Sequence, residues 1–158
     1  MKILLATDGS DHSKAAIAFC RNIITNPENT SIKILSAVER PAPIGPEPFA
    51  VSAEYYTQVE QAGRQQAKVF VEDAETQVQA LFPDSKLNVS EEVISGSPQR
   101  AIVERAKEWG ADLIVLGSHG YGFWSRALLG SVSTSVVNHA PCSVMVVHDN
   151  ESLNGNKR

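Results

Sequence analysis

The 158-residue sequence has little of what would build a disulfide framework or a membrane anchor. Its two cysteines, Cys20 and Cys142, lie far apart in apolar runs, so we expect reduced thiols in or near the core rather than a disulfide or a metal site. No run approaches the ~20 apolar residues of a membrane-spanning helix, and the apolar run at the N-terminus is too short for a signal peptide. These absences predict a soluble, cytoplasmic protein.

Positive charge and catalytic signatures are also scarce. The chain carries 14 Lys and Arg against 18 Asp and Glu, for a net charge of -4, and it has no basic block or basic helix face. Nucleic acids and anionic membranes attract proteins that present a positive field, so we expect neither as a partner. The P-loop signature is absent, and with it the lysine of P-loop hydrolysis. The zinc-protease, nucleophile-elbow and C-x-x-C motifs are absent as well.

The acidic residues do not form a positioned general base. Glu91 and Glu92 are adjacent in a predicted strand, so their side chains should point to opposite faces. Five further carboxylates fall on one long predicted helix and should form its solvated face: Glu54, Glu60, Glu72, Asp73 and Glu75. The sequence therefore predicts no catalytic residues.

Strand-like and helix-like segments alternate along the chain. Strands are predicted at 2–7, 31–38, 87–95, 113–116 and 143–147, and helices at 11–24, 56–81, 98–109 and 132–139. The run at 113–116 is apolar at every position, which is typical of a strand in the middle of a parallel sheet. A proline-rich loop is predicted at 39–52, and a disordered polar tail at 149–158.

This alternation predicts one α/β domain over residues 1–148, with a doubly wound sheet of the Rossmann-like or flavodoxin-like kind. We expect five mainly parallel strands in the order 3-2-1-4-5, with helices on both faces. The switch point of such a sheet lies between its first and fourth strands, which are followed by Asp8 and Gly117. These two residues should therefore meet in one crevice, where ligands of such folds bind.

The most informative motif follows the fourth strand. It begins with Gly117 and Gly120. Nine residues separate Gly120 from Gly130 and Ser131, which open the next helix. Glycines allow positive φ and let a ligand approach bare backbone N–H groups, while a helix N-terminus attracts phosphate. The segment therefore predicts an anion-binding loop that needs no lysine, although each glycine taken alone could simply shape a surface loop.

Three other residues are candidates at the same crevice. Asp8 could accept the hydroxyls of a ribose, or it could bond the backbone of its own turn. Val38 ends the second strand, where its backbone could read an adenine edge and its side chain could pack on the ring; a plain strand end is equally compatible. His119 could donate to a phosphate oxygen or be a solvated loop residue.

These residues resemble those of the universal stress protein family, and the resemblance extends over nearly all of residues 1–148. It is carried by Thr7-Asp8-Gly9-Ser10, Gly96-Ser97-Pro98, Ala111 to Gly120, and Leu129 to Ser133. The spacing G-x2-G-x9-G-[ST] resembles the signature of the ATP-binding branch of the family. One difference is Ala6, where many ATP-binding relatives carry proline.

The resemblance implies roles for most of the candidate residues. Asp8 would bind ribose, and Val38 and Leu116 would border adenine. The phosphates would be held by Gly117, Gly120, Gly130 and Ser131, with Val132 and Ser133 extending the site. His119 would face the triphosphate or its metal ion, Mg²⁺ or Mn²⁺, held by the phosphates.

The resemblance also implies a homodimer, often formed through the last strand. The segment Ser143 to Val147 would be an apolar edge strand that pairs with its symmetry mate, unless the tail or a loop covers it. The implied function is an ATP-binding, nucleotide-dependent regulator of a stress response, with a protein partner that the sequence does not identify. A slow ATPase or adenylyl-transfer enzyme, and a nucleotide-independent dimeric interaction module, remain alternatives, as do AMP and cyclic nucleotides as ligands.

Overall fold

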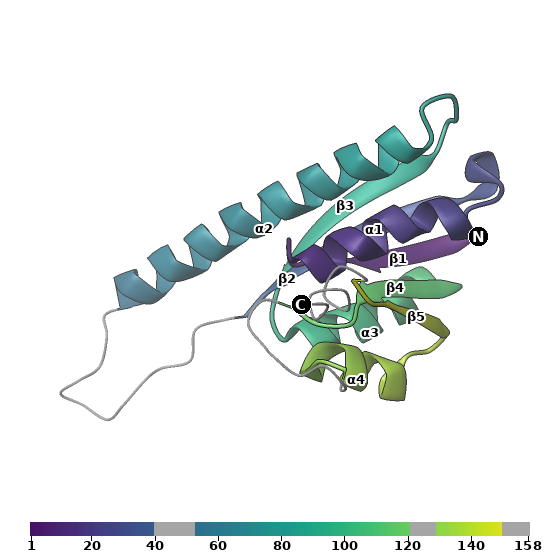
Figure 1. Ribbon diagram of the computed structural model, residues 1–158. Helices are drawn as coiled ribbons and strands as arrows, with labels where there is room; N and C mark the ends of the chain where they lie inside the picture. Colours follow the sequence, from purple (N-terminus) through teal and green to yellow (C-terminus); the bar gives the residue numbers. More distant parts are fainter. Residues whose placement is uncertain (40–52, 121–128, 150–158) are drawn as a thin grey trace, which may run out of the picture.

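A five-stranded sheet forms the centre of the computed structural model, which describes residues 1–39, 53–120 and 129–149 (Figure 1). The strands lie in the order β3-β2-β1-β4-β5, and every neighbouring pair is parallel. They are β1 (Lys2–Ala6), β2 (Ser31–Val38), β3 (Asn88–Ser95), β4 (Leu113–Gly117) and β5 (Ser143–Val147). The predicted doubly wound α/β fold and its strand order are confirmed.

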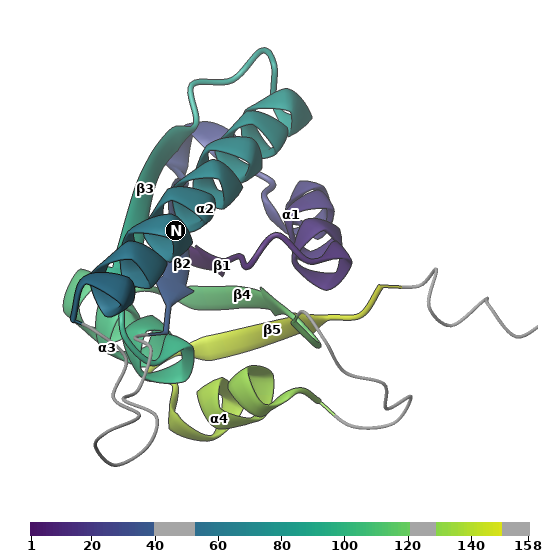
Figure 2. The same ribbon diagram turned by 90° about the vertical axis from the view of Figure 1, so that its left-hand side faces the viewer.

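Helices cover both faces of the sheet. Figure 2 shows α1 (Asp11–Ile23) and α2 (Ala53–Leu81) on one side, and α3 (Pro98–Trp109) and α4 (Ser131–His139) on the other. A short 3₁₀ turn, η1 (Pro27–Asn29), precedes β2. Alternate strand residues feed two buried cores: Ile3, Leu5, Ile32 and Ile34 pack under α1 and α2, whereas Leu4, Leu35, Ile114 and Leu116 pack under α3 and α4.

The same alternation separates Glu91 and Glu92, as predicted. Glu92 lies on the α3 side, where its carboxylate is 2.6 Å from Nη2 of Arg105 and 3.6 Å from Nζ of Lys33. Glu91 lies on the α2 side and forms a side-chain hydrogen bond with Glu75. Glu91 therefore contacts α2 and Glu92 contacts α3, so the two carboxylates do not act together at one site.

Caps at the helix ends match the sequence. The Ser10 hydroxyl accepts a hydrogen bond from the Ser13 N–H and so caps α1, with Asp11 in its first turn. Pro98 opens α3, and Gly110 ends it with φ +67°. Each helix begins where the chain leaves the carboxyl end of a strand, so the caps also fix where the helix N-termini lie relative to the crevice.

The N-terminal half of α2 runs past the sheet (Figure 1). Its 29 residues span about 43 Å, whereas the eight residues of β3 span about 26 Å. The buried apolar residues of α2 are Ala67, Val71, Ala74 and Val78, all in its C-terminal half, while Val59 is 38% exposed. The helix was predicted correctly, but its burial depends on how far the sheet extends.

The remaining predictions about the chain have different outcomes. Cys20 is buried and Cys142 half-buried, and both are free thiols, as predicted. In the described part of the chain, no helix is long and apolar enough to cross a membrane. The proline-rich loop, apart from Glu39, and the tail beyond Asp149 lie outside the described residues.

Candidate functional site

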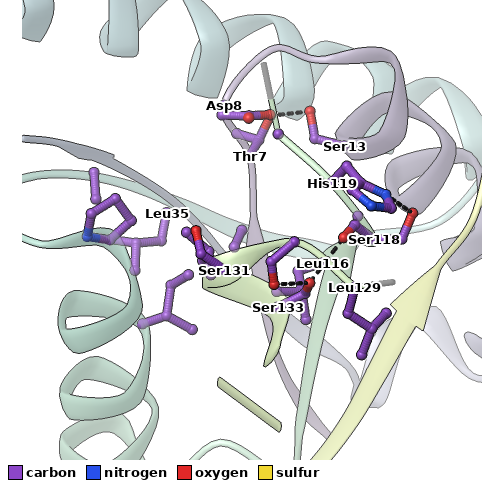
Figure 3. A pocket seen from close by; sticks show the side chains of 18 residues that line it. Thr7, Asp8, Ser13, Leu35, Leu116, Ser118, His119, Leu129, Ser131 and Ser133 are labelled. Atoms are coloured by element: carbon purple, nitrogen blue, oxygen red, sulfur yellow. Dashed lines mark hydrogen bonds between the residues drawn. The ribbon is translucent and has the colours of Figure 1, made fainter. Parts of the chain in front are cut away.

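A cavity of about 780 Å³ opens at the carboxyl ends of β1, β2 and β4 (Figure 3). Its walls come from the ends of these strands, the loops after β1 and β4, and the first turns of α1, α3 and α4. It lies at the switch point where Asp8 and Gly117 were expected to meet, and both residues line it. A volume between about 300 and 1,000 Å³ is typical of small-molecule sites.

One part of the cavity wall is apolar. It is lined by side chains of β1, β2, β4 and α3: Ala6, Leu35, Ala37, Leu116, Pro98 and Ile102. Leu35 and Leu116 are also part of the core under α3 and α4, so this wall is held rigidly by packing. A flat, largely apolar ring such as a nucleobase fits against such a wall because burial of its faces is favourable.

Another part of the wall is polar, and the N-terminus of α4 points into it. Gly130 is the N-cap residue of α4, so no side chain at that position can accept the first N–H groups of the helix. Ser131 is exposed at the first helical position, and Val132 follows it on the cavity wall. The first-turn N–H groups and the helix dipole together favour an anion at this position.

The Ser133 hydroxyl supports the first turn of α4 through two hydrogen-bond contacts. It donates to the Ser118 carbonyl at 2.9 Å and lies 3.0 Å from the Gly130 carbonyl. The Gly130 N–H donates to the same Ser118 carbonyl at 2.8 Å. Ser133 is buried, so it lines the cavity chiefly as a support for the loop that precedes α4.

Asp8 has one structural role and borders the cavity as well. Its Oδ1 accepts hydrogen bonds from the Ser10 N–H at 3.0 Å and the Ser10 hydroxyl at 2.6 Å, which is the local turn role considered above. Its Oδ2 lies against Gly120, where an added Cβ would come within 2.5 Å. The carboxylate is therefore fixed in orientation while it lines the cavity.

The glycines of the motif act through close approach and not through positive φ. The glycines with positive φ among the described residues are Gly9, Gly96 and Gly110. At Gly117 a Cβ would lie 2.6 Å from the backbone carbonyl carbon of His12, and at Gly130 it would lie 3.2 Å from the Ser118 carbonyl oxygen. Of the two properties of glycine considered above, close approach is therefore the one used at these positions, because His12 and Ser118 occupy the space of a side chain.

Val38 is the predicted site residue that the structure places elsewhere. Nine of the ten predicted residues line the cavity, but Val38 does not. Its Cγ1 would lie 2.7 Å from a Cβ at Gly63 of α2, and its carbonyl accepts the Gly96 N–H at 2.8 Å. Strand alternation is the reason: Leu35 and Ala37 face the cavity, so Val38 must face α2.

Several lining residues escaped the sequence reasoning: Thr7, Ser13, Leu35, Ala37, Pro98, Ile102, Ser118 and Leu129. The period of two along β2 would have favoured Ala37 over Val38 once Leu35 was placed toward α3. No comparable sequence signal indicates Pro98 and Ile102, because they reach the cavity only through the packing of α3 on the sheet.

The model of the "Universal stress protein family" matches residues 1–148. The chain belongs to the universal stress protein family. A universal stress protein of Thermus aquaticus is 32% identical over 145 residues, covering 92% of this chain and 96% of the relative. A universal stress protein of Synechocystis is 27% identical over 153 residues, with the same two coverages. A universal stress protein of Mycobacterium tuberculosis is 41% identical, but the match spans 48% of this chain and only 25% of that protein.

Solved universal stress proteins share the fold. UspA from Lactobacillus plantarum has a TM-score of 0.76 at 29% identity, covering 93% of this chain and 97% of that one. A universal stress protein solved in complex with cAMP has a TM-score of 0.66 at 27% identity, covering 94% and 97%. A family member from Arabidopsis thaliana with AMP bound is 18% identical, with a TM-score of 0.65 and coverages of 99% and 97%, and shows the fold alone.

Proposed function

We propose that this universal stress protein binds ATP in the cavity at the switch point and acts as a nucleotide-dependent regulatory dimer in the cytoplasm. The observation that carries the proposal is the first turn of α4, whose N-cap glycine leaves its N–H groups available to the cavity. An apolar wall of suitable size for a base and a carboxylate suited to ribose line the same cavity. Relatives of the same fold that were solved with cAMP or AMP support an adenine nucleotide as the ligand.

The residues present fit ATP. The base would pack against Ala37 and Leu116, the ribose would lie near Asp8, and the phosphates would meet the N–H groups of Ser131 and Val132. Lysine and arginine are absent from the described residues that line the cavity. We propose that Mg²⁺ or Mn²⁺ enters with the nucleotide and is held by the phosphate oxygens. The cation would offset the negative charge of the phosphates, which the lining residues do not neutralise.

The test is a charge placed at the proposed phosphate site. Ser131→Asp puts a carboxylate where the phosphates would bind, and an acidic residue in the first turn favours the helix, so the fold should survive. Asn138→Asp adds the same charge at the opposite, exposed end of α4 and is the matched control. Nucleotide released from the denatured protein is identified by chromatography, and ATP is titrated by calorimetry with and without Mg²⁺.

We expect stoichiometric ATP binding by the wild type and Asn138→Asp. A lost charge-assisted hydrogen bond costs about 1.5–3 kcal/mol, so Ser131→Asp should weaken binding about tenfold or more. A wild type that binds no nucleotide would sink the proposal and leave a nucleotide-independent interaction module. Multiple turnovers of ATP to ADP would make the protein a slow ATPase instead of a binding protein.

The proposed dimer forms through β5, one of the two edge strands of the sheet. The other edge, β3, carries Glu91 and Glu92, which oppose pairing with a second strand, whereas β5 has no charged residue. The Val147 carbonyl accepts the Ser118 N–H, so the backbone groups of Val147 point toward β4. Backbone groups alternate in direction along a strand, so those of Val144 and Val146 point away from β4, to the open side of β5. Antiparallel pairing of two β5 strands would satisfy those groups.

Substitution at Val144 tests the proposed dimer. Val144→Pro removes a backbone N–H from the open side of β5 without removing one from the β4 ladder, and Val144→Ala shortens the side chain but keeps the N–H. Sedimentation should show a dimer for the wild type and Val144→Ala, and a monomer for Val144→Pro. A dimer that persists in Val144→Pro would mean that another surface forms the contact.

A further inference from the structure

Ser118 is a rigidly held residue at the wall of the cavity. Its side chain and backbone are fully buried, and its N–H donates to the Val147 carbonyl at 2.8 Å. Its carbonyl accepts the Gly130 N–H at 2.8 Å and the Ser133 hydroxyl at 2.9 Å. Ser118 is therefore attached both to β5 and to the loop that opens α4, and its hydroxyl has a fixed position.

The Ser118 hydroxyl faces two histidines. Its Oγ lies 3.2 Å from Nδ1 of His119, as Figure 3 shows, and 3.5 Å from Nδ1 of His12. The two imidazole rings are 5.3 Å apart and inclined by 48°. His12 is in the first turn of α1, and its backbone occupies the space beside Gly117. His119 is thus held along one edge by Ser118 and across its face by His12.

The number of hydrogens in this group restricts its arrangements. A hydroxyl has one hydrogen to donate, so Ser118 can donate to only one of the two Nδ1 atoms, and the other Nδ1 must carry a hydrogen to bond it. If Ser118 donates to His12, a neutral His119 carries its hydrogen on Nδ1 and has none on Nε2. If His12 donates to Ser118 and Ser118 to His119, the hydrogen of a neutral His119 is on Nε2, the nitrogen directed away from Ser118.

We propose that His12 is a positioning residue for phosphate binding. It acts through Ser118 to hold His119 as a neutral donor whose Nε2–H bonds a phosphate oxygen. This inference rests on the proposed function, because the phosphate belongs to the nucleotide in the cavity that His119 lines. The order of donation is His12 Nδ1–H to Ser118, Ser118 O–H to His119 Nδ1, and His119 Nε2–H to phosphate. We call these three residues the His-Ser-His relay.

For a neutral His119, a bound phosphate favours this order over the reverse one. Phosphate oxygens are acceptors only, so a neutral His119 without a hydrogen on Nε2 would place a lone pair against an anion. The hydrogen bond from Nε2 to a charged oxygen lowers the free energy of the arrangement that supplies it. The 3.5 Å contact of His12 is the longer of the two, and contacts of this kind tighten when the ligand is bound. The relay therefore favours nucleotides with phosphates over adenosine.

Two substitutions at His12 separate hydrogen bonding from packing. His12→Phe keeps a ring beside His119 but has no donor, whereas His12→Asn loses the ring but places an amide N–H near the position of Nδ1. ATP and adenosine are titrated into the full-length wild type and both variants by calorimetry. We expect His12→Phe to bind ATP about two- to tenfold more weakly and adenosine equally well, because the Ser118 hydroxyl loses the neutral hydrogen bond that orients it toward His119. His12→Asn should bind ATP nearly as the wild type does.

Nitrogen-15 spectra of the imidazoles provide a second readout in the ATP complex. The wild type should show His119 neutral with its hydrogen on Nε2. A hydrogen on Nδ1 of His119, whether the ring is neutral or charged, would overturn the relay. So would His12→Phe that binds ATP like the wild type, or that loses ATP and adenosine equally. In those cases the wild type still binds ATP and the proposed function stands, whereas a wild type that binds neither ligand overturns both.

Discussion

Alanine at Gly117 should mainly lower the stability of the fold, whereas alanine at Gly120 should mainly lower the affinity for ATP, although both glycines belong to the same motif. At Gly117, a Cβ would lie 2.6, 2.7 and 2.8 Å from the backbone carbon, backbone oxygen and Cβ of His12, where ordinary contact begins at 3.4 Å. At Gly120, the near atom is Oδ2 of Asp8 at 2.5 Å, the end of a side chain whose other oxygen is held by Ser10. Neither glycine has a positive φ, so the difference is steric alone.

The magnitudes follow from what must move. In Gly117→Ala, the first turn of α1 has to shift away from β4, and overpacking of this kind costs about 1–3 kcal/mol. We expect the upper end of that range, because two of the three opposing atoms are backbone. In Gly120→Ala, the Asp8 carboxylate has to turn aside and strain its hydrogen bonds from Ser10, so we expect the lower end of the same range, about 1 kcal/mol. Its displaced carboxylate no longer meets the ribose, and ATP affinity should fall about tenfold.

Urea unfolding and ATP calorimetry on the two variants measure these effects. Gly117→Ala should have the lower unfolding midpoint, and Gly120→Ala the larger loss of affinity relative to its loss of stability. Equal stability of Gly117→Ala and the wild type would refute the reasoning, because it would mean that α1 does not require a bare backbone at this position. Unchanged ATP binding by Gly120→Ala would mean that the Asp8 carboxylate does not contact the nucleotide.

Two further predictions concern contacts of α2. Partial desolvation raises the pKa of Glu91 to about 7, and its side-chain hydrogen bond with Glu75 and the charges of Glu75 and Glu72 add to this, while the charge of Lys68 lowers it. Because this pKa is raised on folding, its contribution to stability is complete below about pH 4.5 and is lost as the pH rises through 7. Glu91→Gln should therefore reduce the fall in the free energy of unfolding, measured with urea, between pH 5 and 8. The reduction should be less than about 1 kcal/mol because the side chain is largely exposed. The same pH dependence in Glu91→Gln and the wild type would contradict the raised pKa of Glu91. Gly9→Ala should destabilise by about 2 kcal/mol or more, because Gly9 has φ +76° and the Phe70 ring fills the space of a Cβ. Phe70→Ala should remove part of that cost, so additive losses in the double variant would disprove the contact.

The sequence predicted the elements of the site well because local patterns carry them. The cap at Ser10, the proline at 98 and the glycine at 110 fixed helix ends, and each is determined by residues within one turn. The continuous apolar run of β4 indicated a central strand, from which the switch point followed. The sequence therefore predicts that Asp8 lies in one crevice with Gly117, Gly120, Gly130 and Ser131.

By itself, then, the sequence determined the order of elements, the sheet topology and nine of the residues that border the cavity, because periodicity and caps act over a few residues. Only the tertiary structure decided which face of β2 lines the cavity, where Ala37 and not Val38 lies. It also decided that Gly117 makes room for His12, and that Ser118 joins His12 and His119 across 106 residues of sequence. Such groupings depend on how α1 and α4 pack on the sheet, and no local pattern specifies the distance between side chains on separate elements.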